Sequence, residues 1–400
     1  MIQISPETRA FIRAHQEDDV RALALQAKKY PEVDMPTAIV QIAGRKVATE
    51  KIPSWRKVEN IVYPKHLSLE QCSSETTARY KADLLSGESF ADLTGGFGID
   101  CSFISSQFKA STYVERQKEL CEIAAHNFPL LGLNHVRVVN DDGVAFLSKM
   151  EPIDCLFLDP ARRNEQGGKT VSIADCEPNV KELEDLLLDK ATQVMIKLSP
   201  MLDLSLALKD LPSTYEIHVI SVNNECKELL LLISRKAVDR VPIHCINFTA
   251  HEKQCFIFTR EQEQECDCVY TSDLKPYIFE PNASILKAGG YRSLASHYQI
   301  EKLHPNSHLY TSDQPIDDFP GRTFRMISQS TFNKKEMKEK LGDLQKANLT
   351  VRNFPASVAE LRKRTKLEEG GDTYLFATTL HNEQKILIRC EKYNNNETLR

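Results

Sequence analysis

The sequence predicts an α/β fold built on a mostly parallel sheet, with a helical region before it and small α+β domains after it. Two observations lead to this prediction. Between residues 87 and 236, short apolar runs typical of buried strands alternate with segments of helical periodicity. Residues 1–86 show helical spacing alone, and beyond residue 237 the alternation is lost. Near-continuous apolar strands joined by helical crossovers indicate a sheet covered on both faces.

The composition is that of a globular chain with room for two or three domains. Its 400 residues are 41% hydrophobic and 27% charged, with a formal net charge of −5, which is ordinary for soluble proteins. No apolar run approaches the roughly 18 residues of a membrane span, and residues 1–13 lack a signal-peptide pattern. The eleven cysteines are most simply reduced thiols used as small hydrophobes. We therefore expect a cytoplasmic protein without membrane association.

Helical spacing in the N-terminal region covers residues 19–30 and 36–42, and a further helix follows Ser73 or Ser74, either of which could cap it. Helices between the next strands are expected at Gln117–Asn127 and Asn179–Asp189. The strands themselves are predicted at Ser89–Leu93, Thr112–Glu115, Val136–Asn140, Asp154–Leu158, Gln193–Lys197, Tyr215–Val222 and Lys227–Ser234. Only residues 223–226 join the last two, which predicts a hairpin and hence one antiparallel strand.

The C-terminal part has shorter elements. Strands are expected at residues 241–249 and 254–258, turns at 280–282 and 304–306, and a linker at 315–321. A small α+β domain then follows, with strands at 324–328, 350–353 and 374–379 and helices at 331–341 and 357–364.

A glycine-rich turn after the first predicted strand carries the strongest functional signal. The residues that end the strand and open the next helix are Asp92, Thr94, Gly95, Gly96 and Gly98. Glycines let the backbone approach a ligand that a Cβ would block. The next strand ends at Glu115, a carboxylate about 20 residues further on that is placed to bind ribose hydroxyls. The dinucleotide pattern G-x-G-x-x-G does not fit, because residues 99–101 contain no glycine. We therefore expect S-adenosylmethionine as cofactor, its amino group near Asp92 and its methionine part on the glycines.

Two further strand ends supply candidate residues, since ligands of open α/β sheets bind at the carboxyl ends of the strands. Asp142 follows the third strand and is expected to bind the adenine amino group, with helix capping an equally good interpretation. Asp159 and Pro160 follow the fourth strand, where the methyl acceptor must lie, and Asp159 would orient an acceptor N–H or O–H. Arg162, with Arg163, would hold substrate charge such as phosphate. Asp159, Pro160 and Arg162 are the catalytic candidates.

With these motifs, residues 87–236 resemble a class I S-adenosylmethionine-dependent methyltransferase, a class with a Rossmann-like sheet and an acidic-proline motif after the fourth strand. The cysteine nucleophile of RNA carbon-5 enzymes is missing after strands four and five, so a covalent mechanism is not expected. Exocyclic-amine enzymes carry Asp/Asn-Pro-Pro and then an aromatic residue, whereas here Ala161 and Arg162 follow Asp159-Pro160.

Ribose 2′-O-methyltransferases, by resemblance, would use a Lys-Asp-Lys-Glu tetrad. The residues near the corresponding elements are Lys81, Asp159, Lys197 and Glu228. A strand-end charge and a solvated hairpin residue also explain Lys197 and Glu228. A base nitrogen is our first choice of acceptor and a ribose hydroxyl the second, while a protein or small-molecule acceptor stays open.

The whole chain more closely resembles a bacterial group of class I methyltransferases with a THUMP-like C-terminal domain. The likeness rests on residues 67–75, 92–100, 158–163, 277–282, 287–289, 353–355, 362–364 and 370–376. It implies a helical N-terminal region (1–86), a methyltransferase domain (87–236), a β-rich connector with a ferredoxin-like segment (237–325) and a THUMP-like RNA-binding domain (326–400). Since THUMP domains bind structured RNA, it also implies rRNA or tRNA as the substrate.

Charge in the last segment agrees with an RNA partner. With few acids between them, the basic residues are Arg322, Arg325, Lys334, Lys335, Lys338, Lys340, Lys346, Arg352, Arg362, Lys363, Arg364 and Lys366. A local basic patch is typical of phosphate-backbone binding, although part of it also fits a solvated helix face.

No metal site is predicted from the sequence. The candidate ligands are His244, His251, Cys255, Cys266 and Cys268, which lack paired C-x-x-C elements. Buried thiols in strands are the better interpretation.

Overall fold

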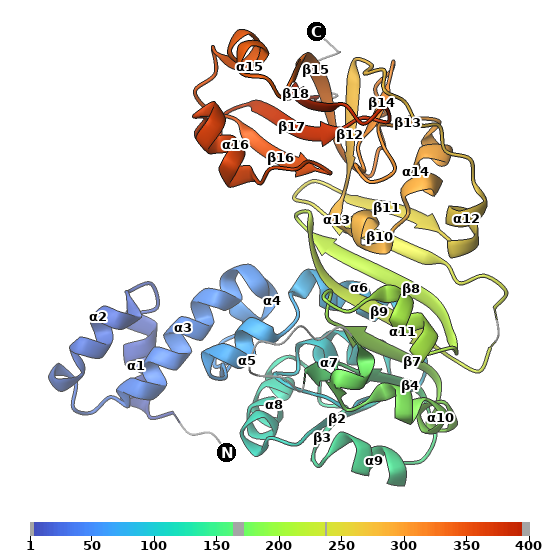
Figure 1. Cartoon of the computed structure of the whole chain (residues 1–400). Coiled ribbons are helices and arrows are strands. Elements are labelled where there is room, and N and C mark those ends of the chain that lie inside the picture. Colours follow the sequence, from blue (N-terminus) through green and yellow to red (C-terminus); the bar gives the residue numbers. More distant parts are fainter. Residues whose placement is uncertain (1–3, 163–171, 237, 394–400) are drawn as a thin grey trace. The chain divides into compact units, whose positions relative to one another are not determined.

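The structure is a computed structural model that describes residues 4–162, 172–236 and 238–393 (Figure 1). Two compact units share the chain, and each is described by itself. Unit 1 comprises Met1–Tyr215 and Leu230–Ala237, and unit 2 comprises Glu216–Leu229 and Val238–Arg400. Among the described residues, no helix has both the length and the apolar character needed to cross a membrane.

The larger sheet has nine strands in the order β11-β10-β8-β9-β7-β4-β1-β2-β3. Its central strand β1 (Ser89–Asp92) pairs in parallel with β2 (Ala110–Glu115) and β4 (Ile153–Leu158). Further parallel pairs join β3 (Val136–Asn140) to β2 and β7 (Ala191–Leu198) to β4. The carboxyl ends of these five strands therefore lie at one edge of the sheet. The predicted α/β class and the five predicted strands are confirmed.

Crossover helices connect these strands, as the periodicity predicts. Their bounds are α7 (Ile99–Ile104), α8 (Lys118–Leu130), α9 (Gly143–Lys149), α10 (Val180–Lys190) and α11 (Leu204–Asp210). Helix α8 packs against β2 and β3, and α10 packs against β7. Strands β4 and β7 are buried along nearly their whole length, which explains their continuous apolar sequence. A two-residue pair, β5 (Ala161–Arg162) with β6 (Cys176–Glu177), follows β4.

The predicted hairpin is formed by β8 (Thr214–Val222) and β9 (Glu225–Ile233). Its two turn residues, Asn223 and Asn224, have φ angles of 51° and 63°, as a type I′ turn requires. Strand β10 (Ile243–Phe248) then pairs in parallel with β8, and β11 (Lys253–Phe258) pairs antiparallel with β10. The larger sheet thus continues beyond residue 236.

The N-terminal region is helical, as its spacing predicts. Its helices are α1 (Pro6–Ala14), α2 (Val20–Leu25), α3 (Met35–Lys51), α4 (Pro53–Arg56), α5 (His66–Gln71) and α6 (Glu75–Leu84). Backbone and side-chain hydrogen bonds of 2.8–2.9 Å between Val62 and Asn127 join this region to α8. Ser74 caps α6 by accepting from the Thr77 N–H at 3.3 Å, so Ser73 is free for another role.

Unit 2 contains a seven-stranded sheet in the order β13-β14-β12-β15-β18-β17-β16. Its strands are β12 (Tyr277–Pro281), β13 (Glu301–Lys302), β14 (Tyr310–Ser312), β15 (Gly321–Thr331), β16 (Asn348–Arg352), β17 (Thr373–Thr379) and β18 (Lys385–Lys392). Its helices are α12 (Arg260–Glu265), α13 (Ala283–Ala288), α14 (Tyr291–Tyr298), α15 (Lys334–Leu341) and α16 (Val358–Thr365). Leu341 of α15 and Leu361 of α16 share one apolar cluster with Leu375 of β17, so both helices are anchored on the same core.

Candidate active site

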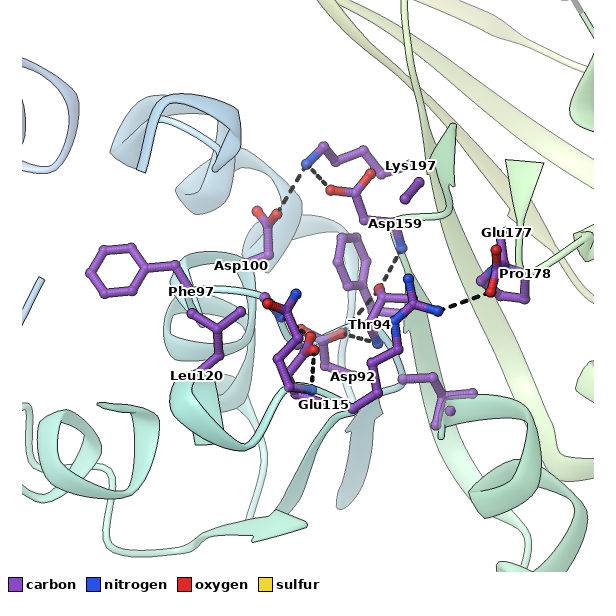
Figure 2. Close-up of a pocket in the computed structure, with 18 of the residues that line it drawn as sticks. Asp92, Thr94, Phe97, Asp100, Glu115, Leu120, Asp159, Glu177, Pro178 and Lys197 are labelled. Atoms are coloured by element: carbon purple, nitrogen blue, oxygen red, sulfur yellow. Dashed lines mark hydrogen bonds and ion pairs between the residues drawn. The ribbon is translucent and has the colours of Figure 1, made fainter. Parts of the chain in front are cut away.

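A pocket of about 510 Å³ opens where the parallel strands of unit 1 end (Figure 2). This volume lies in the range of small-molecule sites. The predicted residues that line it are Asp92, Thr94, Gly95, Gly96, Gly98, Glu115, Asp142 and Asp159. Strands β1, β2 and β4 therefore bring together side chains that are far apart in the sequence.

The glycine-rich turn lies directly on β2. The Gly95 N–H donates to the Val114 carbonyl at 2.9 Å, and a Cβ on Gly95 would lie 2.3 Å from Cε2 of Tyr113. Gly96 has a φ of +55°, which favours glycine, and its carbonyl accepts from the Tyr113 hydroxyl at 2.5 Å. Only a residue without a side chain fits at Gly95, whereas a Cβ on Gly96 would meet nothing nearer than the Thr94 carbonyl at 3.7 Å.

Glu115 is held in place by the backbone. Its Oε2 accepts from the Gly96 N–H at 2.9 Å and its Oε1 from the Gln117 N–H at 2.8 Å. Each carboxylate oxygen can accept a further hydrogen bond. The carboxylate is thus fixed with capacity left for a pair of hydroxyl groups.

Asp92 is fully buried at the end of β1 and accepts from the Thr94 N–H at 2.9 Å. Burial raises the pKa of this carboxyl well above its ordinary value. A ligand ammonium group would favour the ionised form and reverse that shift. Thr94 also accepts from the Asp159 N–H at 2.7 Å, so it joins the ends of β1 and β4.

Asp142 has the capping role that was one of its two interpretations. Its Oδ1 accepts from the Val144 and Ala145 N–H groups, each at 3.0 Å, at the start of α9. The same residue lines the pocket. Its adenine-binding role stays a prediction.

Asp159 meets a lysine from the neighbouring strand (Figure 2). Lys197, near the end of β7, forms an ion pair with Asp159 and lies 3.5 Å from Oδ2 of Asp100. Lys81, which is completely buried on α6, lies 3.0 Å from Oδ1 of Asp100. Burial by itself raises the pKa of Asp100, but the two ammonium groups overcome it and hold that pKa below its ordinary value.

Ser73 links the charged groups of this network. Its hydroxyl donates to Asp100 Oδ2 at 2.7 Å and accepts from Lys81 Nζ at 3.0 Å and Lys197 Nζ at 3.2 Å. Neither Ser73 nor Asp100 was predicted as a site residue. The doubled serine at 73–74 offered a signal, because one helix needs only one capping hydroxyl. Glu228, the fourth member of the proposed tetrad, is buried on β9 in unit 2.

The remaining catalytic candidates are described in part. Pro160 is buried, and the backbone of Arg162 pairs with Cys176. The side chain of Arg162, and Arg163 altogether, lie outside the described residues. Cys72 also lines the pocket, but burial raises the pKa of its thiol to about 11. A protonated thiol is a poor nucleophile, which agrees with the expectation of a non-covalent mechanism.

Half of the predicted basic residues are already paired with carboxylates in unit 2. Salt bridges connect six of its twelve cations to carboxylates: Arg322 and Arg352 to Glu280, Arg325 to Glu391, Lys340 to Glu339, Lys346 to Glu368, and Arg362 to Glu369. Few acids lie between these cations along the sequence, but folding brings in four of these five glutamates from outside residues 322–366. The other six cations are exposed on α15 or at α16 and its C-cap: Lys334, Lys335, Lys338, Lys363, Arg364 and Lys366. We call these six the α15–α16 basic patch.

Comparison with known proteins adds two kinds of match. A ferredoxin-like domain model matches residues 277–320, and a THUMP domain-like model matches residues 321–392. No match was found among curated proteins. A solved protein of Porphyromonas gingivalis W83, assigned to the methyltransferases, is 33% identical with a TM-score of 0.88, over 98% of this chain and all of that one.

Smaller likenesses were also found. An S-adenosylmethionine-dependent methyltransferase from Agrobacterium tumefaciens is 15% identical over 40% of this chain and 61% of that one, with a TM-score of 0.31. M. capricolum TrmK, solved with S-adenosylhomocysteine, is 12% identical over 44% of this chain and 70% of that one, with a TM-score of 0.32.

Proposed function

Because the chain belongs to the class I S-adenosylmethionine-dependent methyltransferases with a THUMP-like C-terminal domain, we propose that it methylates RNA, at a base nitrogen oriented by Asp159. The observation that carries the proposal is that Asp159 shares one pocket with Asp92 and Glu115. A carboxylate for the acceptor thus lies beside the two carboxyl groups suited to the cofactor. Its side chain is 37% exposed, so an acceptor can reach it.

The pocket fits the cofactor by the chemistry of its lining. Glu115 would hold the ribose hydroxyls, Asp92 the amino group and Asp142 the adenine, while the turn at Gly95 and Gly96 would pack against the methionine part. When bound, S-adenosylmethionine supplies an electrophilic methyl group on its sulfonium sulfur. The chain's own part is to align the acceptor nitrogen and to accept a hydrogen bond from it at Asp159. Pro160 would stiffen that turn and Arg162 would hold substrate charge.

The ribose hydroxyl is the second candidate acceptor, and one observation favours it. Lys81 and Lys197 both contact Ser73 and Asp100, and Lys197 also pairs with Asp159, so three of the four predicted tetrad members belong to one network. A hydroxyl must lose its proton to react at neutral pH, and a lysine that has given up its own proton can take it. Lys197 is in contact with Asp159 and would take this role once it has released the proton that it holds as an ammonium group in the ion pair.

RNA is proposed as the substrate on two grounds. Residues 321–392 match the THUMP-like model, whose resemblance implies RNA binding. The α15–α16 basic patch supplies exposed cations of the kind that bind phosphates. If the protein does not methylate RNA, a protein or a small molecule replaces RNA as the proposed acceptor.

The test compares turnover with cofactor binding in purified variants. Asp159→Ala should abolish methyl transfer to RNA, while S-adenosylmethionine still binds in calorimetry at near wild-type affinity. Asp185→Asn, an exposed carboxylate on α10, is the matched control and should act as wild type. Loss of cofactor binding in Asp159→Ala would assign Asp159 to the cofactor and contradict the proposed role.

Lys197→Met separates the two acceptors. If a base nitrogen is methylated, this variant should keep measurable turnover, because Asp159 still accepts the hydrogen bond. If a ribose hydroxyl is methylated, turnover should fall as far as in Asp159→Ala. Nucleoside analysis of the product, which distinguishes a base methyl from a 2′-O-methyl, must agree with the kinetic result.

A further inference from the structure

Three potential metal ligands lie together in unit 2, and none of them lines the pocket of unit 1. Glu216 and His218 are two residues apart on β8, so their side chains share one face of the sheet. His244 on β10 pairs directly with His218 in the parallel register. A hydrogen bond of 3.1 Å from the Ile217 N–H to the Pro242 carbonyl fixes that register. The backbone therefore places the three residues on one face of two adjacent strands.

Their distances suit a small cation. Oε1 of Glu216 lies 3.3 Å from Nε2 of His218 and 3.0 Å from Nε2 of His244. One ligand atom from each residue falls within 4.8 Å of the others. Zinc bonds of about 2.0–2.1 Å in a tetrahedron place neighbouring ligand atoms roughly 3.3 Å apart. Both carboxylate–imidazole distances already match. The two imidazoles are stacked with their ring centroids 4.6 Å apart, so they would have to rotate for both nitrogens to face one ion.

The three side chains differ in their exposure to solvent. Glu216 and His244 are 27% and 21% exposed, while His218 is buried. An ion can therefore enter from solvent.

We propose that Glu216, His218 and His244 bind one divalent transition-metal ion, with zinc the best match to two imidazoles and one carboxylate. Three protein ligands would leave a fourth position for water, and the ion would tie β8 to β10.

This site is independent of the proposed RNA methylation. It replaces the expectation of no metal. Of the ligands weighed from the sequence, only His244 belongs to it. Residues 216, 218 and 244 have no recognisable spacing until the strands pair.

The experiment titrates the full-length, chelator-treated protein with zinc in competition with a chromophoric chelator. The wild type should bind one equivalent, and zinc should raise its melting temperature. His244→Gln and Glu216→Gln should each bind at least about tenfold more weakly, since even the loss of an outer hydrogen-bond partner of a ligand costs 10–100-fold. His251→Gln, at an exposed histidine between β10 and β11, is the matched control and should bind as wild type.

Cobalt distinguishes this site from the eleven thiols. Bound Co²⁺ should give visible bands of a tetrahedral site without the intense ultraviolet absorption of a cobalt–thiolate bond. The proposal is overturned if the wild type binds no equivalent of zinc, if thiolate absorption accompanies binding, or if both variants bind as wild type. Should His244→Gln fail to fold, Glu216→Gln, at a partly exposed side chain, decides the question alone.

Discussion

Asp100 lies in contact with the ammonium groups of Lys81 and Lys197, and its replacement tests how much the active-site network contributes to stability. The Lys81–Asp100 contact is 3.0 Å and the Lys197–Asp100 contact 3.5 Å, with side-chain exposures of 0–11%. At an effective dielectric constant of about 20, a pair 3.0 Å apart attracts by about 5 kcal/mol. Desolvation offsets most of that gain, yet removing one partner leaves a buried charge and costs about 3–5 kcal/mol.

Asp100→Asn should therefore lower the free energy of unfolding by about 3–5 kcal/mol, which is roughly 6–20 °C in melting temperature for a domain of this size. Urea denaturation followed by circular dichroism measures it. The pKa of Asp100 is lowered in the folded chain, so its contribution is present above the unfolded value of about 3.9 and is lost as pH falls through the folded one. The difference between wild type and variant should shrink accordingly in acid.

The control is a shorter but exposed ion pair in the same unit. Lys109 and Glu88 lie 2.6 Å apart with exposures of 78% and 70%, and such a pair contributes less than about 1 kcal/mol. Glu88→Gln should leave stability nearly unchanged. Equal, small effects of Glu88→Gln and Asp100→Asn would refute the reasoning, because burial and not distance is what separates the two pairs.

Three further predictions concern the cofactor and the RNA. Gly95→Ala should destabilise the chain by about 1–3 kcal/mol, because its Cβ overlaps the Tyr113 ring. The same variant should weaken S-adenosylmethionine binding in calorimetry. Unchanged binding would contradict the proposal that the cofactor packs closely against this turn. The raised pKa of Asp92 makes the folded wild type lose stability as pH rises from about 4 through the folded pKa. Asp92→Asn should therefore melt higher than wild type at alkaline pH while binding the cofactor at least tenfold more weakly, and a parallel pH–melting curve would argue against a buried carboxyl. The double variant Lys338→Glu, Lys363→Glu should bind RNA at least tenfold more weakly than wild type, and its RNA affinity should depend less steeply on salt concentration. Its cofactor affinity should be normal. If the salt dependence of RNA binding is unaltered, the α15–α16 basic patch does not contact RNA.

The carboxyl edge of the sheet was predictable because its signals are local. Each strand is a short apolar run that ends in a polar residue, as at Asp92, Glu115 and Asp159. Once parallel crossovers are expected, those ends must meet at one edge. The glycine-rich turn is a further local signal. Gly95 cannot carry a side chain, because a Cβ there would overlap the Tyr113 ring.

The network around Asp100 was not predictable in the same way. Lys81, Asp100 and Lys197 lie on α6, α7 and β7, and Ser73 lies in the loop before α6. The resemblance pointed to Lys81 and Lys197, but no local pattern distinguishes the four residues from a cap, a helix charge or a strand-end charge. Their roles follow from burial, because a charged group removed from water is strongly destabilising unless a group of opposite charge lies beside it. Residue types alone carry no information on which charges are buried together.

For the basic segment, the sequence predicted more than the structure shows. A count of cations along the sequence overstates the positive charge available to a ligand, because Glu280 on β12 forms salt bridges with both Arg322 and Arg352 after the strands pair. The six cations of the α15–α16 basic patch stay exposed instead, because the opposite face of each helix is fixed in the core by Leu341 and Leu361. Sheet topology decides which charges remain available.

Mass spectrometry of nucleosides from rRNA and tRNA tests the central claim most directly, comparing a strain that lacks this protein with its parent. The proposal predicts that one base-methylated nucleoside disappears and returns with the wild-type protein but not with Asp159→Ala. Loss of a 2′-O-methylated nucleoside instead would select the second acceptor. If no methylated nucleoside changes in either RNA, the proposed RNA substrate is contradicted, and a protein or small-molecule acceptor takes its place.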